Sequence, residues 1–316
     1  MKIEELNILD IIDLEEAGEN LFQSRNLLSH PQVLRPGVFG GQIVAQSLNA
    51  AYKTVTKEFK AHSLHAYFLL PALSEIPILY EVYRERDGKT YAARVVYARQ
   101  NGRSVFTLMC SFTKIEKSEF NHQHTMPSVP SPDTFICEEE RFKLTSEQAK
   151  CPPFHRYLLK DRFRNQIKPF EFRAIVSNTD EGLITPPIKA SHRYFWLRSR
   201  KKLTDDTREH HCALAFASDE ECLFTAGLPL GVAFVTDPHI SMLTSLDHTL
   251  YFHEEFRADE WLLLELEAVK LKNARGYVLG RIYRQDGTLV ASIVQEGIVR
   301  IKQGSMDKVL MQECKF

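Results

Sequence analysis

The chain has 316 residues, of which 44% are hydrophobic and 26% are charged. Its 40 Lys and Arg residues nearly balance its 41 Asp and Glu residues, so the formal net charge is -1. This composition is typical of a globular protein with one large domain or two ordinary ones. It excludes the strongly basic surface of a nucleic-acid-binding protein, although a small anionic ligand needs only a few cations.

No segment predicts export or a membrane span. The first five residues are acidic and lack the apolar run of a secretory signal. The longest apolar runs, such as residues 261–264, are far shorter than the roughly 20 residues that a spanning helix needs. The six cysteines contain no C-x-x-C pair, which favours reduced thiols in an intracellular protein over a disulfide framework.

The first regular element that we predict is a helix over residues 39–52. Its apolar residues Val44, Leu48, Ala51 and Tyr52 are separated mainly by small residues. This spacing indicates a helix with a narrow apolar stripe that a sheet can wrap closely. The two glycines at 40–41 could begin an anion-binding helix terminus, but close packing is the favoured interpretation.

A meander of about four strands follows over residues 62–112. Asn101-Gly102 is a strong signal for a type I′ hairpin turn, in which both central residues need positive φ. Residues 92–97 before this turn and 105–109 after it are rich in apolar, β-branched and aromatic side chains. They therefore predict two long antiparallel strands.

The middle of the chain, residues 116–200, is less regular. It contains the proline-rich segments 126–133 and 151–153, which are typical of loops. A strand-like segment, residues 193–198, follows them. We interpret residues 1–115 as an N-terminal domain, residues 116–190 as a linker region and residues 191–316 as a C-terminal domain.

The C-terminal part repeats the layout of the first. Tyr67-Phe68 recurs 184 residues later as Tyr251-Phe252. The hairpin residues 100–102 recur 185 residues later as 285–287, and a helix-like segment at 213–219 precedes the second set of strands. A repeated helix-plus-meander unit predicts an α+β fold with internal duplication.

Several sequence signatures of common enzymes are absent. The chain has no G-x-S-x-G elbow, no G-x-G-x-x-G motif and no P-loop. His253-Glu254 lacks the second histidine of a zinc motif, and the pairs His62/His65 and His122/His124 lack a third ligand. We therefore expect neither a metal nor an organic cofactor.

Within this duplicated pattern, eight short segments resemble the acyl-CoA thioesterase II family. Their order in the chain matches the family from about residue 20 to 300. They are residues 38–42, 62–68, 87–89, 125–128, 217–219, 246–249, 274–276 and 290–297.

The resemblance implies a double-hotdog fold, in which two antiparallel sheets each wrap around a long central helix and the two halves share a sheet. It also implies hydrolysis of fatty acyl-CoA to free fatty acid and CoA. The family's catalytic group, an Asp, a Ser or Thr and a Gln, falls on Asp219, Ser245 and Gln295.

These residue types suit the reaction. A thioester is reactive enough for direct attack by water, so Asp219 would act as general base without an acyl-enzyme. Ser245 and Gln295 would hold that water near attack distance. Backbone N–H groups at a helix N-terminus would stabilise the charge on the carbonyl oxygen.

Spacing alone supports more ordinary roles for the same residues. Asp219 before Glu220-Glu221 resembles a helix N-cap, Ser245 a turn or edge hydroxyl, and Gln295 a solvent-facing strand residue. The repeat alignment places Cys110 where the second half has Gln295. We therefore expect the first half to lack the catalytic set and each chain to hold one active site.

Two alternatives to the thioesterase remain open. A non-catalytic acyl-CoA binding or sensing protein of the same fold would need the catalytic set to be broken, and a hydratase would need a histidine-based site. His248, the nearest histidine to the matched segments, belongs to the thioesterase pattern. We also expect a homo-oligomer.

The last three residues, Cys314-Lys315-Phe316, partly resemble the peroxisomal tripeptide Ser-Lys-Leu. They keep the small residue and the base but replace leucine with phenylalanine. This similarity favours the peroxisome, with the cytosol as the alternative location.

Overall fold

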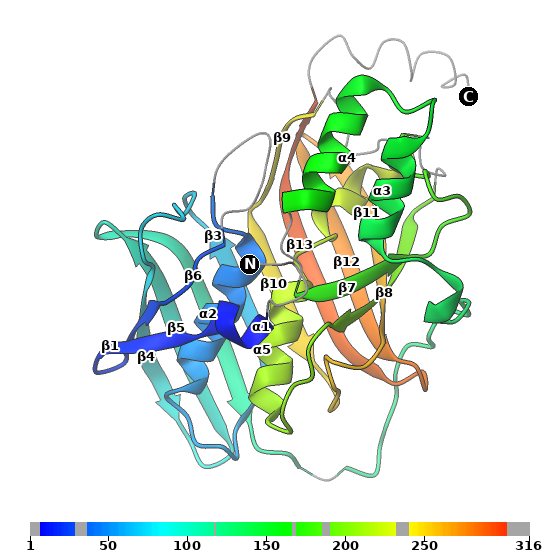
Figure 1. Ribbon diagram of the computed structural model, residues 1–316. Coiled ribbons are helices and arrows are strands. Elements are labelled where there is room, and N and C mark those ends of the chain that lie inside the picture. Colours follow the sequence, from blue (N-terminus) through cyan, green and yellow to red (C-terminus); the bar gives the residue numbers. More distant parts are fainter. Residues whose placement is uncertain are drawn as a thin grey trace.

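The computed structural model describes residues 7–28, 37–116, 118–165, 169–184, 190–231 and 240–301. A single antiparallel sheet of thirteen strands curves around the helices α2 and α5, which lie side by side (Figure 1). The helices are α1 (Ile8–Ile12), α2 (Gly40–Tyr52), α3 (Glu138–Glu147), α4 (Pro153–Asn165) and α5 (Thr207–Ala217), with 3₁₀ helices η2 (Pro132–Thr134) and η3 (Leu223–Leu230).

Each half of the sheet contains strands from one half of the chain. The first half supplies β1 (Leu14–Gly18), β2 (Leu21–Ser24), β3 (Lys60–Phe68), β4 (Leu79–Asp87), β5 (Tyr91–Gln100) and β6 (Arg103–Thr113). The second supplies β7 (Phe170–Ala174), β8 (His192–Ser199), β9 (Ile240–Ser245), β10 (Asp247–Phe252), β11 (Leu262–Lys272), β12 (Arg275–Arg284) and β13 (Leu289–Ile301). The strand order is β1-β2-β4-β5-β6-β3-β10-β13-β12-β11-β8-β7, and β9 also pairs with β13.

The two halves join where β3 pairs with β10. His65 lies opposite Thr249 in this pair, and the two residues are separated by the 184-residue repeat offset. Residues on either side are therefore exchanged by a pseudo-twofold axis at this point. The predicted double hotdog with a shared sheet is confirmed.

The register also confirms the alignment of the repeats. Cys110 on β6 pairs with Arg94 on β5, and Gln295 on β13 pairs with Val278 on β12. These two pairs occupy the same place in their respective halves. Cys110 and Gln295 are thus structural equivalents, as the sequence repeat predicts.

The predicted first helix is confirmed as α2, and it is buried on nearly all sides. Eleven of its thirteen residues are buried, so its polar side chains need partners within the protein. Gln42 donates to the carbonyl oxygens of Ile11 and Asn26 at 3.0 and 2.7 Å. Gln46 accepts from the Tyr80 hydroxyl at 2.6 Å. The small side chains of α2 allow this close enclosure.

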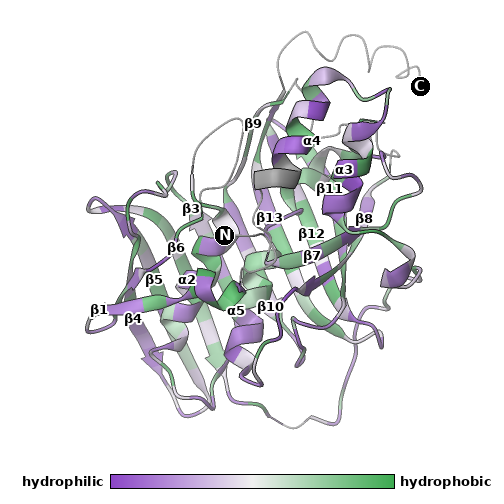
Figure 2. Ribbon diagram, viewed as in Figure 1, coloured by the Kyte–Doolittle hydropathy of each residue, from purple (hydrophilic) through white to green (hydrophobic). Residues whose placement is uncertain are grey.

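The strands alternate between buried and more exposed residues, as β5 does along its whole length. Figure 2 shows the same mixture of hydrophobic and hydrophilic residues along the sheet. The side that faces α2 and α5 forms the main hydrophobic core. One face of the sheet is therefore buried and the other is partly open to solvent.

The segment between the two repeats has more structure than the sequence predicts. It contains the helices α3 and α4, and it adds the edge strand β7 beside β8. Its loop packs Met126, Val129 and Phe135 onto a second-half cluster around Trp196 and Tyr283. This loop covers part of the outer face of the sheet. The domain boundaries at residues 115 and 190 stay predictions.

Candidate active site

The first predicted catalytic residue, Asp219, follows the C-terminal end of α5. The helix ends at Ala217, and Ser218 is its C-cap. The 3₁₀ helix η3 begins only at Leu223, so Asp219 does not cap a helix N-terminus. The N-cap interpretation of Asp219 is therefore wrong.

Ser245 reaches the same region from an irregular point of the sheet. It is the last residue of β9, and Asp247 begins β10. The equivalent strand of the first half, β3, has a register shift at the corresponding place, between Ala61 and Ser63. A local break of this kind redirects a side chain away from the regular alternation of the strand.

Gln295 lies on β13, on the inner face of the sheet. Its side chain is fully buried, so the interpretation as a solvent-facing strand residue is wrong. The strand pattern gave no sign of this role, because the alternation of β13 fits either face.

The structure brings all three predicted residues together. Gln295 Nε2 donates to Asp219 Oδ1 at 2.6 Å and to Ser245 Oγ at 2.7 Å. Ser245 Oγ lies 3.5 Å from Asp219 Oδ1 and can donate a long, weak hydrogen bond to it. The carboxylate, the hydroxyl and the amide thus form one connected cluster.

The hydrogen-bond donors of Gln295 are fully used within the cluster, whereas the donor of Ser245 is not. A glutamine amide has two N–H groups, and both of those of Gln295 are used by Asp219 and Ser245. The hydroxyl of Ser245 accepts one of them, and its own proton makes only the long contact to Asp219. Ser245 is therefore the member of the cluster with a donor available for another molecule.

The carboxyl group of Asp219 binds its proton more tightly than an ordinary aspartate does. Burial raises its pKa to about 7, although hydrogen bonds from Gln295, the Gly41 backbone and Ser245 act in the opposite direction. Burial acts this way because it disfavours the charged form of a carboxyl group. A carboxylate that titrates near neutral pH can both accept and return a proton.

The first half of the chain also contributes to the site, through the start of α2. A Cβ atom on Gly40 would lie 2.7 Å from Asp219 Oδ2, and one on Gly41 would lie 2.3 Å from the Phe216 carbonyl oxygen. The backbone N–H of Gly41 also donates to the Asp219 carboxylate. The favoured interpretation of close packing is confirmed, and the same glycines bring a helix N-terminus to the carboxylate.

The equivalent place in the first half has a different chemistry. The residue equivalent to Ser245 is Ala61, and Cys110 replaces Gln295. Phe112 fills the position of Gly297, where a side chain would collide with Leu223 at 2.5 Å. The first half therefore lacks this hydroxyl and this amide, and an aromatic ring occupies the corresponding space.

Within the described part of the chain, no three His, Cys, Asp or Glu side chains are grouped as metal ligands. Five cysteines in that part are free thiols: Cys110, Cys137, Cys151, Cys212 and Cys222. No helix in it is long and apolar enough to span a membrane.

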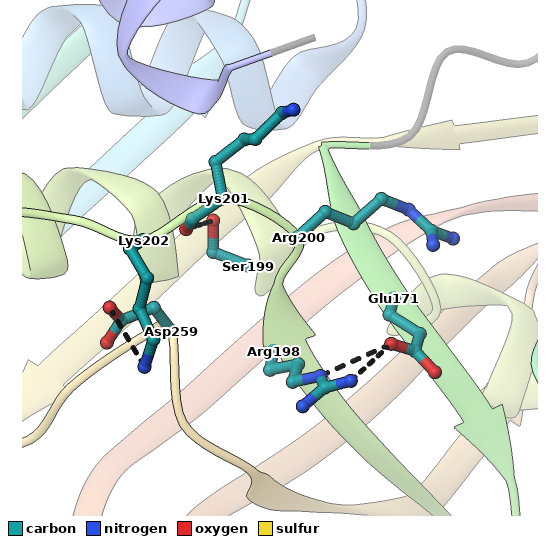
Figure 3. A pocket seen from close by; sticks show the side chains of 7 residues that line it. All are labelled: Glu171, Arg198, Ser199, Arg200, Lys201, Lys202 and Asp259. Carbon is teal, nitrogen blue, oxygen red and sulfur yellow. Dashed lines mark hydrogen bonds and ion pairs between the residues drawn. The ribbon is translucent and has the colours of Figure 1, made fainter. Parts of the chain in front are cut away.

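A polar pocket of about 260 Å³ lies at the end of β8, away from the three predicted residues (Figure 3). Its cations largely pair with neighbouring acids. Arg198 binds Glu171 at 3.0 Å, and Lys202 lies 3.7 Å from Asp259. The pocket contains none of the clustered residues, so it is separate from the candidate active site.

Comparison with known proteins assigns the family. A model of the acyl-CoA thioesterase N-terminal domain matches residues 30–113, and a model of acyl-CoA thioesterase matches residues 179–298. Acyl-coenzyme A thioesterase 8 from Homo sapiens is 36% identical, with 93% of this chain and 89% of that protein covered. The chain belongs to the acyl-CoA thioesterase family.

Other members of the acyl-CoA thioesterase family agree. Acyl-CoA thioesterase 2 from Haemophilus influenzae is 31% identical over 94% of this chain and 98% of its own length. The crystal structure of an acyl-CoA thioesterase II from Mycobacterium marinum matches with a TM-score of 0.72 and 32% identity, covering 94% of this chain and 99% of that one. The expectation of a thioester hydrolase is confirmed.

Proposed function

We propose that this member of the acyl-CoA thioesterase family hydrolyses fatty acyl-CoA by direct attack of water, with Asp219, Ser245 and Gln295 as its catalytic residues. The observation that carries the proposal is the cluster itself. Three side chains from separate parts of the chain meet within hydrogen-bonding distance, 2.6 to 3.5 Å.

Asp219 serves as the general base. The water donates one proton to its carboxylate while the water oxygen attacks the thioester carbonyl carbon. The tetrahedral intermediate then expels the CoA sulfur, and the proton held by Asp219 passes to that sulfur. The products are the free fatty acid and CoA thiol, and Asp219 returns to its ionised form.

Ser245 and Gln295 have different tasks in this proposal. Ser245 holds the water, because its hydroxyl proton makes only a long contact within the protein. Gln295 orients the other two residues with both of its N–H groups. Its buried Oε1 atom has no partner among the described residues and can accept a hydrogen bond from the water.

The start of α2 stabilises the negative charge that develops on the thioester oxygen. A helix N-terminus carries a partial positive charge on its first N–H groups. In α2 the Gly41 N–H donates to Asp219 and the Gln42 N–H donates to the Phe39 carbonyl oxygen at 3.1 Å, which leaves the Gly40 N–H as the donor for the oxyanion. The glycines at this terminus lie against the Asp219 carboxylate, so the reacting carbonyl would meet them. Donors aimed at the developing oxyanion lower the barrier to attack.

The test is release of free thiol from palmitoyl-CoA and shorter acyl-CoA substrates by the purified full chain. We expect turnover by the wild type and loss of turnover in Asp219→Asn. Saturable binding of acyl-CoA without turnover at any chain length would instead favour the alternative of a non-catalytic binding or sensing protein. Full activity of Asp219→Asn would exclude Asp219 as the base.

We also propose a peroxisomal location. One relative, from Saccharomyces cerevisiae, is named peroxisomal acyl-coenzyme A thioester hydrolase 1 and is 28% identical over 93% of this chain and 94% of its own length. The tripeptide Cys314-Lys315-Phe316 lies outside the described residues. A fluorescent protein fused to the N-terminus should give punctate signal, and deletion of the tripeptide should make it diffuse. Diffuse signal from the intact fusion would favour the cytosol.

A homo-oligomer is proposed from the outer face of the sheet. Tyr67, Met109 and Tyr251 are exposed on β3, β6 and β10, beside the junction of the two halves. Such a patch is an efficient contact surface for a second copy. Sedimentation analysis should give more than one chain per particle, and Met109→Glu should reduce that number.

A further inference from the structure

His248 is a fully buried histidine on β10, the strand that joins the two halves. Its Nε2 atom lies 2.8 Å from the hydroxyl of Ser218. Ser218 is the C-cap of α5 and directly precedes Asp219. His248 is therefore connected by one hydrogen bond to the turn that presents the proposed general base.

The direction of this hydrogen bond follows from the neighbours of Ser218. The hydroxyl of Ser218 donates to the carbonyl oxygen of Ala215 at 3.0 Å. A hydroxyl has one proton to donate, so Ser218 accepts from the N–H at Nε2 of His248. Among the described residues, Nδ1 of His248 has no hydrogen-bond partner. The ring is thus a neutral donor, and burial lowers its pKa to about 4.

His248 also lies beside the proposed catalytic amide. Thr249 on β10 pairs with Val294 on β13, so the next residues, His248 and Gln295, occupy the adjacent rung. Both side chains are fully buried. The imidazole of His248 therefore contacts the turn that precedes Asp219, and His248 lies beside Gln295 on the neighbouring strand.

Packing does not explain why this position holds a histidine. A buried polar atom without a partner lowers stability compared with an apolar side chain of similar shape. The internal repeat supplies the comparison, because His65 and Thr249 lie at the pseudo-twofold axis. The residue equivalent to His248 is Leu64, which is also fully buried.

The change from leucine to histidine accompanies the change in chemistry between the two halves. The first half, with Leu64, has Ala61 and Cys110 where the second half has Ser245 and Gln295. The fold therefore accepts leucine at this position of the sheet. At this position, histidine occurs only in the second half, which has the complete proposed catalytic set.

We propose that His248 is a positioning residue of the thioesterase reaction, which fixes the Asp219 carboxylate by holding Ser218 at the end of α5. This inference rests on the proposed function of Asp219. Small errors in the position of a general base have large effects on rate, because attack requires the water to lie close to the carbonyl carbon along the right direction.

The decisive variant is His248→Leu, which installs the residue of the first half. We expect the variant to fold with a melting temperature equal to or above that of the wild type. Its kcat for palmitoyl-CoA should fall about 10-fold to 100-fold, since a misplaced base costs rate without weakening substrate binding. KM should stay nearly constant.

Two further substitutions separate hydrogen bonding from packing. His248→Gln can place an amide N–H near the position of Nε2 and should recover most of kcat. His248→Asn is too short to reach Ser218 and should remain impaired. This contrast also tests the inference if His248→Leu fails to fold.

His211→Leu is a matched control. His211 is another buried histidine, in the middle of α5, and its Nδ1 lies 2.7 Å from the Tyr52 hydroxyl. Its replacement should lower the melting temperature and leave kcat unchanged. A wild-type kcat in His248→Leu, or equal activities of the Gln and Asn variants, would overturn the role of His248. Absence of turnover in the wild type would overturn the proposed function and this inference together.

Discussion

The amide of Gln295 donates to the carboxylate of Asp219 across 2.6 Å, although the two residues come from different elements and are 76 positions apart. Both residues belong to the second half of the chain, but the carboxylate also touches the first half. The Gly41 N–H donates to it, and a side chain at Gly40 would overlap it. The candidate active site is therefore built between the two halves.

Replacement of Asp219 by asparagine should abolish most turnover. The amide has nearly the same shape but cannot accept a proton from water. We expect kcat to fall about 100-fold to 10,000-fold, the range that general bases contribute. Thiol release from palmitoyl-CoA measures this loss, and circular dichroism checks that the fold is intact. A rate within severalfold of wild type would show that another group removes the proton.

The pH profile of kcat/KM should have an acidic limb near pH 7. The carboxyl of Asp219 has a pKa of about 7 because it is buried, and only its ionised form is a base. Activity should therefore fall as the pH decreases through 7, and this limb should be absent from the residual activity of Asp219→Asn. A wild-type rate that stays constant down to pH 5 would contradict the raised pKa.

The same raised pKa predicts an effect on stability. The folded state binds a proton on Asp219 more tightly than the unfolded state, whose aspartate titrates near 4. The contribution of this residue to stability is therefore fully present below pH 4 and is lost as the pH rises to about 7. Asparagine cannot ionise, so Asp219→Asn should become increasingly more stable than wild type across this interval. Thermal melts at pH 5 and pH 8 test this, and an equal difference at both pH values would contradict it.

Ser245 should tolerate threonine but not alanine. Threonine keeps the hydroxyl that accepts from Gln295 at 2.7 Å, whereas alanine removes both this acceptor and the donor proposed to hold the water. We expect kcat to fall at least about 10-fold in Ser245→Ala and much less in Ser245→Thr. Steady-state kinetics on both variants measures the difference. Equal activities would remove the hydroxyl from the mechanism.

Gly40→Ala should inactivate the enzyme more than it destabilises the fold. The added methyl group would lie 2.7 Å from Asp219 Oδ2 and 2.9 Å from the Phe68 ring, so the carboxylate must shift. Gly37→Ala is the matched control, because its nearest neighbour would be the Ala72 carbonyl oxygen at an ordinary 3.5 Å. Thiol release and thermal melts should show a loss of kcat for Gly40→Ala alone.

The sequence predicted the duplicated fold because the repeat is carried by local signals. Asn101 and Gly102 both have positive φ, as a type I′ turn requires. In the second hairpin Gly287 has positive φ but Asp286 does not, so this turn is of another type. The apolar stripe of α2 and the alternation of the long strands are likewise local patterns. These features depend on neighbours in the chain, so they can be recognised without coordinates.

The additional elements between the repeats could not be recognised in this way. The helices α3 and α4 are rich in charged residues and lack a clear apolar stripe. They are held instead by tertiary contacts, such as the hydrogen bond that Arg141 of α3 donates to the carbonyl oxygen of Glu181 at 2.7 Å. Their packing partners come from distant parts of the chain.

The site residues likewise depend on contacts between distant parts of the chain, which leave no local pattern in the sequence. The family resemblance identified Asp219, Ser245 and Gln295, but spacing alone favoured ordinary roles for all three. The pairing of His248 with Ser218 gave no sequence signal, because the two residues are 30 positions apart and join different elements. The repeat alignment could have pointed to it, since Leu64 stands at the equivalent position.

The glycine pair at the start of α2 gives the first half a part in the proposed reaction. That half places its helix terminus against the Asp219 carboxylate, so the proposed active site needs both units. The first unit has Ala61 and Cys110 in place of the hydroxyl and the amide, while its Gly40 and Gly41 lie at the helix terminus beside Asp219. When the two units are fused in one polypeptide, each can carry different residues at its site. In a pair of identical subunits, every substitution would appear at both sites.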